Sequence, residues 1–312
     1  MGFHSPTSTS SPETWESEDE HAFGYPLQRM VPLEDEESSP SGPLRGLYKM
    51  PTESSSTSSH MLFVDFEAVV DEYLSHYNTA NSPDMVIVEA GSSLPSETPA
   101  SLIIRRVKRD STEHTILQSL NSDEIRSDPW NPAPNLLYMA ERGDDAILCF
   151  ERLFGCDNPP LQTVANVIDY IRQALEGLCF LHEHNIVHHA YGDPKGVMMD
   201  IGRPSTADFD RTRFPVRYYR INFARAQQLS RDVDPRSASF CSDVSDCGSL
   251  LQVLVDEVPK IGGKLRSLVV AMIGGEYGAE DARKLFEALC QGIDASTYDA
   301  PLHPPAPARN KP

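Results

Sequence analysis

Four histidines fall within eight residues near the middle of this 312-residue chain, and imidazole is a common ligand of zinc, copper and nickel. They are His182, His184, His188 and His189. A zinc hydrolase of the commonest pattern carries a His-Glu-x-x-His helix and a carboxylate that acts as the general base. The sequence contains no such helix and no obvious carboxylate partner for the cluster. A metal-binding protein is therefore an alternative interpretation, but not the favoured one.

The histidines follow a segment with the periodicity of a long amphipathic helix. Apolar residues recur at steps of three and four from Val164 to Leu181, which predicts a helix with one face in the core. A polar turn at 182–185 follows, and then the apolar pair Ile186-Val187, a loop, and a short apolar run at 197–200. These elements would hold the histidine-containing loop close to the core.

This order of elements resembles the catalytic-loop region of eukaryotic protein kinases. The ending Met-Met-Asp at 198–200 is most similar to a kinase-like family common in basidiomycete fungi. In such a loop an Asp accepts the proton of the substrate hydroxyl and an Asn holds a magnesium ion. The resemblance implies that His188 corresponds to the motif's His and packs under the loop. The other positions are substituted: His189 replaces the Arg, Ala190 replaces the Asp, and Lys195 or Gly196, depending on the alignment, replaces the Asn.

The segment 215–224 resembles the family's strand that ends in Ile-Asp-Phe-Gly, and here it ends in Ile-Asn-Phe-Ala. The Asp of that motif carries the magnesium ion that bridges the nucleotide phosphates. Asn222 stands in its place and is a neutral oxygen donor, so we expect metal affinity to fall. Phe223 is retained. Ala224 lacks the conformational freedom that Gly would supply.

The resemblance also implies a nucleotide cleft in the first half of the chain. Two short runs rich in β-branched residues, 85–88 and 101–104, predict strands. Arg105 would then occupy the place of the family's phosphate-anchoring Lys, and Glu113, at the start of helix C, would pair with it. The alternative is that both are ordinary surface charges. The linker between the runs contains only Gly91, whereas a nucleotide clamp needs several glycines, so we expect no clamp there.

A strand predicted at 146–153 resembles the one that leads into the hinge between the two lobes of a kinase. In that alignment Phe150 is the gatekeeper, and Glu151 to Leu153 would face an adenine. A buried strand that simply leaves the core fits the residues equally well. Asp243 resembles the first Asp of the family's F helix, which supports the backbone of the catalytic loop. Further helices are predicted at 61–77, 264–273 and 280–293.

A weakly active Ser/Thr kinase, which would transfer the γ-phosphate of ATP to a protein, is the other alternative. It would need Asp193 as a replacement base and one of three carboxylates as a metal ligand, namely Asp200, Asp208 or Asp210. Their spacing favours none of them in particular. A further alternative is that the chain has no selected activity, and a single sequence offers no test of it.

Composition narrows the class of partner. The formal net charge of −19 argues against nucleic acid or an anionic membrane, because both require a basic face. No apolar run approaches the roughly 18 residues that span a membrane. The six cysteines are scattered without metal-ligand spacing. We therefore expect reduced, buried thiols in an intracellular protein, either cytoplasmic or nuclear.

Both ends of the chain differ in composition from its centre. Residues 1–58 are rich in Ser, Thr and Pro and contain ten acidic residues against three basic ones, which predicts disorder. Other kinases could phosphorylate this tail at Ser5, Ser11 or Ser39, each of which precedes a proline. The Pro-rich segment 294–312 is predicted to be a second disordered tail.

Together these observations predict an α+β, two-lobed protein-kinase-like fold. Its small β-rich lobe would span 59–153 and include helix C, and its mainly helical lobe would span 154–293. The substituted motifs predict a pseudokinase that serves as a binding or scaffolding module for protein partners that the sequence does not identify. ATP and magnesium are the cofactors that the resemblance implies, and the substitutions weaken the expectation for both.

Overall fold

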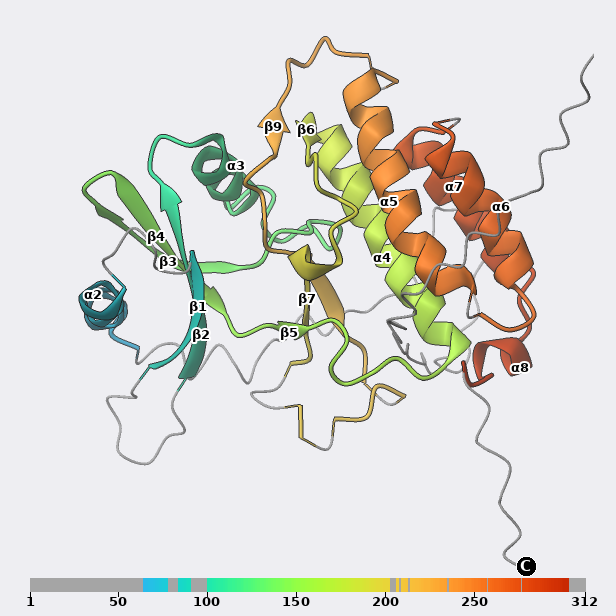
Figure 1. The fold of residues 1–312 in the computed structure, drawn as a ribbon, viewed down its shortest axis with the longest axis horizontal. Coiled ribbons are helices and arrows are strands. Elements are labelled where there is room, and N and C mark those ends of the chain that lie inside the picture. The colour runs from blue at the N-terminus through green and yellow to red at the C-terminus, as the bar shows by residue number, and fades with distance from the viewer. Residues whose placement is uncertain are drawn as a thin grey trace, which may run out of the picture.

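The computed structural model describes residues 64–77, 84–90, 100–202, 206–207, 209–212, 214–234, 236–256, 258–275 and 277–302. These residues form a mixed α+β fold of seven α-helices and small antiparallel sheets. Figure 1 shows the largest sheet with two short helices at one end of the molecule and a group of longer helices at the other. The predicted α+β class is confirmed.

The largest sheet has the strand order β1-β2-β4-β3, and all neighbouring strands are antiparallel. Its strands are β1 (Met85–Ala90), β2 (Ala100–Lys108), β3 (Leu136–Arg142) and β4 (Asp145–Glu151). Consecutive side chains of a strand enter opposite faces, so the buried neighbours Ile103 and Ile104 of β2 belong to two different apolar clusters. Both faces of the sheet are therefore covered.

One helix lies on each face of this sheet (Figure 1). α2 (Phe66–His76) packs Val70 and Tyr73 against the face that carries Ile104. α3 (Thr112–Leu120) packs its apolar residues into the main core on the face that carries Ile103. That main core continues without interruption from α3 into the group of longer helices.

The longer helices are built around α4 (Val164–Glu183), which is buried along the predicted apolar stripe. α4 packs against α5 and α7 and touches α8 (Figure 1). The bounds of these helices are α5 (Ala238–Asp256), α6 (Gly262–Ile273), α7 (Ala279–Cys290) and α8 (Ala295–Tyr298). The helices predicted around 164–181, 264–273 and 280–293 are confirmed, with ends that differ by a few residues.

Short strands arrange the segment between α4 and α5. β6 (Ile186–Val187) pairs with β9 (Gln227–Gln228). β7 (Val197–Asp200) pairs on one side with β5 (Phe154–Gly155) and on the other with β8 (Arg217–Arg220). A turn of 3-10 helix, η2 (Pro194–Gly196), leads into β7. These pairings bring the loop after β6 beside the chain that follows β8.

Several predicted boundaries need correction. The Pro-rich tail predicted from 294 is wrong for 294–302, because α8 forms there and Leu302 is buried. Backbone hydrogen bonds of 2.9 Å join Val164 to Ala300 and Leu302 to Gln162, so this segment covers the start of α4. The strand predicted to reach 153 ends at 151. Residues 1–58 and 303–312 lie outside the described residues, with Ser5, Ser11 and Ser39, and the predictions for them stay predictions.

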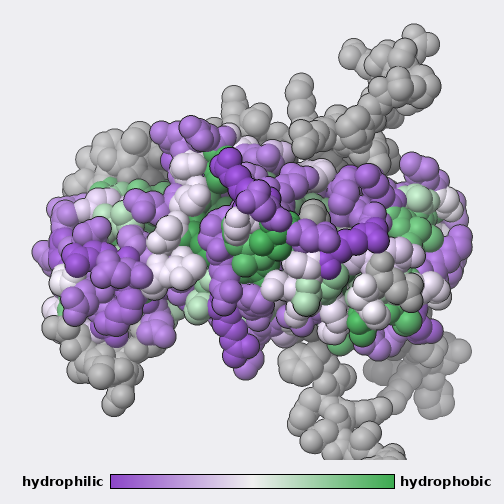
Figure 2. Space-filling view, turned by 90° about the horizontal axis from the view of Figure 1, so that it is seen from above, coloured by the Kyte–Doolittle hydropathy of each residue, from purple (hydrophilic) through white to green (hydrophobic). Residues whose placement is uncertain are grey.

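The face seen in Figure 2 is largely hydrophilic, with small apolar spots. Within the described part of the chain the large apolar side chains that are exposed are Ile87, Phe214, Val253 and Val270. No described helix is both long enough and apolar enough to cross a membrane. All six cysteines are free thiols and four of them are buried, in agreement with the prediction of reduced thiols.

Candidate functional site

Asp243 on α5 holds the loop that follows β6. Its carboxylate is fully buried and accepts hydrogen bonds from the backbone nitrogens of His188 at 2.6 Å and His189 at 2.7 Å. His182 Nε2 lies 3.4 Å from the same group. A carboxylate is well suited to this task because its two oxygens can accept from two amides at once. The predicted support of the loop by Asp243 is confirmed as a contact, although α5 begins five residues earlier than that Asp.

The ring of His188 lies under the loop, as predicted. It is buried and packs edge-on against Phe223 and Tyr191, with ring centroids 5.1 and 5.5 Å away. Neither ring nitrogen has a hydrogen-bond partner within the described residues. Burial, together with the smaller effect of the nearby positive charge of Arg220, lowers the pKa of His188 to about 4. His188 is therefore a neutral packing residue at physiological pH.

His189 has an unusual backbone, with a φ of +54°. A non-glycine residue in this left-handed region is strained, and it persists where its surroundings hold it. Here the hydrogen bond to Asp243 holds the peptide. Three residues later, a Cβ placed on Gly192 would come within 2.8 Å of the backbone oxygen of Asp246, so only glycine allows the loop to lie this close to α5.

Arg105 and Glu113 form the predicted ion pair, at 2.6 Å between Arg105 Nη2 and Glu113 Oε1. Their side chains are only 12% and 10% exposed, so the alternative that they are ordinary surface charges is wrong. The pair also reaches the segment after β8. Arg105 Nη2 donates to Asn222 Oδ1 at 3.2 Å, and the backbone nitrogen of Phe223 donates to Glu113 Oε1 at 3.2 Å. The sheet, α3 and this segment are thus joined by one polar network.

The two residues proposed for the metal-binding Asn position lie differently. Gly196 sits beside Asn222, since a Cβ on Gly196 would be 3.9 Å from that of Asn222, and the oxygen of Gly196 accepts from Ile221 at 3.0 Å. Lys195 is exposed. The glycine is therefore the residue next to Asn222, and it has no side chain with which to bind a metal ion. Ala190, which the resemblance to kinases places at the position of a catalytic Asp, also has no ionisable group.

The carboxylates considered as replacements have local structural partners. Asp193 Oδ1 accepts from the backbone nitrogen of Lys195 at 3.0 Å, which is an N-cap of η2. Asp200 accepts from Gly202 at 2.7 Å and lies at the end of the β7–β8 hairpin opposite to Asn222. Asp210 accepts from the backbone and hydroxyl of Thr212. Asp208 lies outside the described residues.

The histidine cluster does not form a metal site within the part of the chain that the structure describes. No group of three or more His, Cys, Asp or Glu side chains converges there. His184 Nδ1 is 2.8 Å from the oxygen of Phe180, one turn back on its own helix. The ring of His182 packs at a tilt against that of Phe240, with centroids 4.6 Å apart, and His188 lies between aromatic rings. The alternative of a four-histidine metal centre is therefore not retained.

The residues proposed for an adenine contact are mostly inside the core. Phe150 pairs with Ile103 across β2 and β4, and both it and Leu153 are buried in the main apolar cluster. Glu151 ends β4, and burial together with the charge of Asp200 raises its pKa. These positions match the interpretation of a buried strand that leaves the core.

The linker that begins at Gly91, in which we expect no nucleotide clamp, also connects far from Arg105. Gly91 and its neighbours lie outside the described residues, but the register of the hairpin fixes where they connect. Ala90 pairs with Ala100, whereas Met85 pairs with Arg105. Five residues along a strand span roughly 17 Å. The segment 91–99 therefore joins the hairpin at the end far from Arg105, and the segment that precedes β1, at 78–83, is the one that connects beside it.

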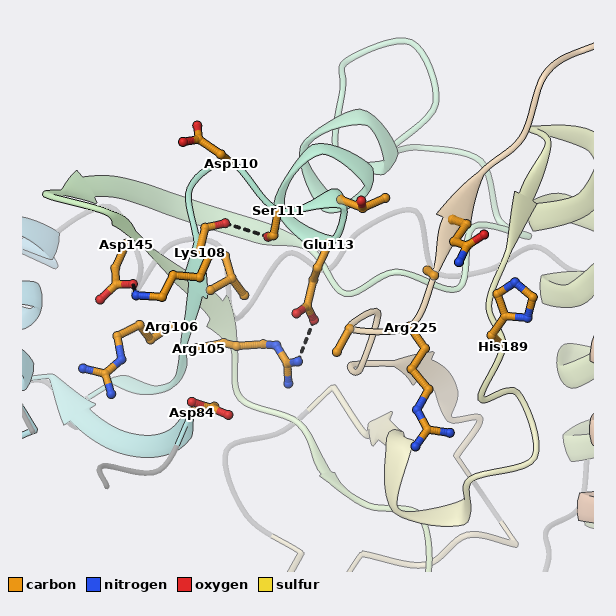
Figure 3. Close-up of a pocket in the computed structure, with 15 residues that line it drawn as sticks. Asp84, Arg105, Arg106, Lys108, Asp110, Ser111, Glu113, Asp145, His189 and Arg225 are labelled. Carbon is orange, nitrogen blue, oxygen red and sulfur yellow. Dashed lines mark hydrogen bonds and ion pairs between the residues drawn. The ribbon is translucent and has the colours of Figure 1, made fainter. Parts of the chain in front are cut away.

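A polar cavity of about 1250 Å³ opens between β2, the start of α3 and the segment after Asn222 (Figure 3). Its walls include Arg105, Lys108, Ser111, Glu113, His189 and Arg225. The side chain of Arg225 extends from the chain after β8 on the opposite side of Glu113 from Lys108 (Figure 3). Neither Phe150 nor Leu153 belongs to these walls. Sequence reasoning missed Arg225, although its place directly after Asn-Phe-Ala was a usable signal.

Comparison with known proteins gives no family for this arrangement, since no protein-family model matches the chain and no curated protein sequence matches it. The chemistry of the site therefore follows from its own residues. They supply a supported loop without an ionisable group at Ala190, an ion pair between strand and helix, and a cavity lined by charged side chains. Such a site can bind a ligand, and the residue at position 190 of its loop has no ionisable group.

Proposed function

We propose that this protein is a two-lobed protein-kinase-like domain that has lost phosphoryl transfer and acts as a binding or scaffolding module. The observation that carries this proposal is the carboxylate of Asp243. It holds the amides of His188 and His189 in place, while the next residue, Ala190, has no group that could accept a proton. Asp243 thus holds the loop in the way expected for a kinase catalytic loop, but the loop carries alanine at the position of the catalytic Asp.

The polar network around Arg105 supports the same interpretation. In kinases a Lys on a strand and a Glu on helix C form an ion pair that positions the nucleotide phosphates. The pair between Arg105 on β2 and Glu113 on α3 has the same placement on strand and helix. We take the sheet with α3 as the smaller lobe and α4 to α7 as the larger one.

The substitutions argue against catalysis on quantitative grounds. Loss of a positioned general base costs about 10² to 10⁴ in rate. The metal positions are affected as well, because Gly196 has no side chain and Asn222 is neutral. These losses are not multiplicative when the residues act as a unit, but each acts on the same step. The protein would therefore be retained for what it binds.

Residual kinase activity is the competing proposal, and it depends on Asp193. The carboxylate of Asp193 is bonded to the amide of Lys195, so it would have to leave this cap to act as a base. An N-cap carboxylate contributes about 1 kcal/mol to its helix, which opposes that movement. We therefore favour the binding module.

A phosphoryl-transfer assay with the purified full-length chain tests the proposal. The protein is incubated with γ-labelled ATP, magnesium or manganese, and general protein substrates. We expect no label above that of a heat-denatured sample. Metal-dependent transfer that is lost in Asp193→Asn and kept in Asp232→Asn would overturn the proposal. Asp232 is a suitable control because it is an exposed acid in the segment after β9, and asparagine can replace Asp193 as a cap.

A further inference from the structure

One short proline pattern occurs twice in this chain, once in each terminal segment. Four pairs of prolines have the spacing Pro-x-x-Pro, and two of them are followed by an arginine two residues later. These two are residues 40–45, Pro-Ser-Gly-Pro-Leu-Arg, and residues 304–309, Pro-Pro-Ala-Pro-Ala-Arg. Both lie outside the described residues, one before α2 and the other after α8. The pattern Pro-x-x-Pro-x-Arg is therefore confined to the parts of the sequence on either side of the described fold.

A Pro-x-x-Pro pair inside the fold has a structural role instead. Pro129 and Pro132 lie between α3 and β3, and no arginine follows them at the same spacing. The oxygen of Pro132 accepts from the backbone nitrogen of Arg220 at 2.7 Å, and its ring lies beside Gly177, where an added Cβ would come within 3.0 Å of it. The two terminal pairs differ from this one in both sequence and position.

Prolines spaced by three residues are recognised through the polyproline II helix. This helix has three residues per turn, so Pro40 and Pro43, like Pro304 and Pro307, fall on one edge of it. Proline already fixes φ near the value of this helix, and such a segment therefore loses little conformational freedom when it binds. Aromatic-lined grooves of the SH3 type bind Pro-x-x-Pro segments in this conformation. The spacing thus indicates the kind of groove that fits.

Both motifs lie in basic stretches of an acidic chain. Residues 38–52 and 300–312 each contain two basic residues and no acidic one, although the chain as a whole has a net charge of −19. The basic residues are Arg45 and Lys49 in the first stretch, and Arg309 and Lys311 in the second. The arginine of each motif can form charge-assisted hydrogen bonds with a carboxylate at one end of the groove. The partner that fits therefore combines aromatic rings with acidic side chains.

The structure shows where the second motif leaves the folded body. Leu302 is buried, and its backbone nitrogen donates to the oxygen of Gln162 at 2.9 Å. Pro301 forms a β-bridge with Thr163, so it is held at the start of α4 although it lies three residues before Pro304. One residue separates Leu302 from Pro304. The segment available to a partner therefore begins at Pro304, directly beside the fold.

The first motif is joined to the opposite end of the molecule. α2 lies against the largest sheet, whereas α8 lies beside the longer helices at the other end (Figure 1). The chain between Arg45 and Asp65, the N-cap of α2, can extend by roughly 65 Å. Two partner domains can therefore be bound at once without competing for space.

We propose that each of the two motifs binds an SH3-type domain, so that one chain joins two such domains. The ligand of each domain is the polyproline II segment itself, with its prolines on the aromatic rings of the groove and its arginine on the acidic side chains beside them. This binding gives the scaffolding role a class of partner. It does not depend on the kinase-like interpretation, because neither motif includes a residue of the cleft.

Calorimetric titration of the purified full-length chain tests the proposal. The probes are a panel of purified SH3 domains that select ligands with the arginine after the prolines. We expect members of the panel to bind with two domains per chain. Arg45→Ala should leave one domain bound at the original affinity, because the Kd at the altered motif rises by about tenfold or more. Arg309→Ala should do the same for the other motif, and the double variant should lose both.

Two controls separate recognition of the motif from attraction between opposite charges. Lys49→Ala and Lys311→Ala each remove one positive charge from the same stretch but leave the motif intact, so binding should be unchanged at low salt. A domain whose groove tryptophan is replaced by lysine should fail to bind the native chain, because the prolines then have no aromatic surface to contact.

Four results would overturn the proposal. No member of the panel binds with a Kd below about 1 mM, or only one domain binds to the native chain. The lysine variants lose as much affinity as the arginine variants, or the double arginine variant still binds two domains. Each of these results is independent of the phosphoryl-transfer assay, so this proposal can fail while the protein remains inactive toward ATP, and the reverse also holds.

Discussion

Asp243 Oδ1 lies 2.7 Å from the backbone nitrogen of His189, and this hydrogen bond holds His189 in a left-handed conformation with a φ of +54°. A strained residue of this kind costs on the order of 1 to 3 kcal/mol, which the surrounding contacts must offset. Because the other oxygen of Asp243 accepts from His188, one buried carboxylate fixes two successive peptides. The loop conformation therefore depends on a charge on α5 far along the sequence.

Replacing Asp243 by asparagine should destabilise the protein by about 3 kcal/mol. Asparagine keeps the shape of the side chain, but its NH2 group can only donate. It would face a backbone N–H of His188 or His189, so two donors would meet. Urea unfolding measures the change in the free energy of unfolding. Asp246→Asn is the matched control on the same helix, because the carboxylate of Asp246 makes no hydrogen bond among the described residues and burial already raises its pKa. Equal effects of the two substitutions would contradict the role given to Asp243.

The ion pair between Arg105 and Glu113 should show strong coupling in a double-mutant cycle. Arg105→Met or Glu113→Gln alone leaves a buried charge or donor without its partner, so each should cost about 3 kcal/mol. Their combination should cost clearly less than the sum, with a coupling free energy of about 2 kcal/mol. The pair of Arg266 and Asp256, at 2.8 Å but 55% and 50% exposed, serves as the control and should couple by less than about 1 kcal/mol. Similar coupling in both pairs would show that the Arg105 pair is not enclosed in solution.

His188 should make the folded state sensitive to acid. Its pKa falls from an ordinary value of 6.5 to about 4 on folding, so the unfolded chain binds a proton more readily than the native one. The stability contribution is present above pH 6.5 and is lost as the pH falls from there toward 4. It amounts to at most about 3 kcal/mol. In His188→Phe this part of the acid loss should disappear, as measured by urea unfolding at a series of pH values.

The same variant tests the packing of the ring. Phenylalanine keeps the contacts with Phe223 and Tyr191, and it removes two ring nitrogens that have no partner within the described residues. Stability at pH 7 should therefore be maintained or increased. His76→Phe is a control on the exposed surface of α2, where the acid dependence should not change. An unaltered pH profile in His188→Phe would mean that the imidazole titrates normally in the native state.

The elements with strong local patterns could be predicted from the sequence. The apolar stripe of α4 is recognisable in the sequence because a buried helix of about five turns repeats its apolar residues many times. The Arg105–Glu113 contact was accessible through the resemblance to kinases, which pairs a strand residue with a helix residue. β3 escaped prediction, since its residues alternate weakly and most of them are only half-buried. β9 is two residues long and polar, and only its pairing with β6 defines it.

Sequence reasoning was wrong or incomplete where the conformation of a segment depends on contacts with distant parts of the chain. The linker 91–99, in which we expect no nucleotide clamp, follows a strand, but only the register of β1 against β2 shows that Arg105 lies at the other end of the hairpin. The segment after 294 has the composition of a loose tail, and it is ordered by contacts with the start of α4 that no local pattern reveals. The four histidines are neighbours in sequence, yet the turn after α4 sends their rings in separate directions.

Helix α2 has a consequence for where the domain begins. Val70 and Tyr73 cover Ile104 and its neighbours on the outer face of the sheet, and Asp65 caps the helix through the amide of Ala68 at 3.1 Å. A chain cut between α2 and β1 would keep every strand and every residue of the cleft, but it would present an apolar sheet face to water. Such faces pair with one another or with other proteins. The smallest piece that stays dispersed at high concentration therefore starts ahead of Asp65, some twenty residues before the first strand.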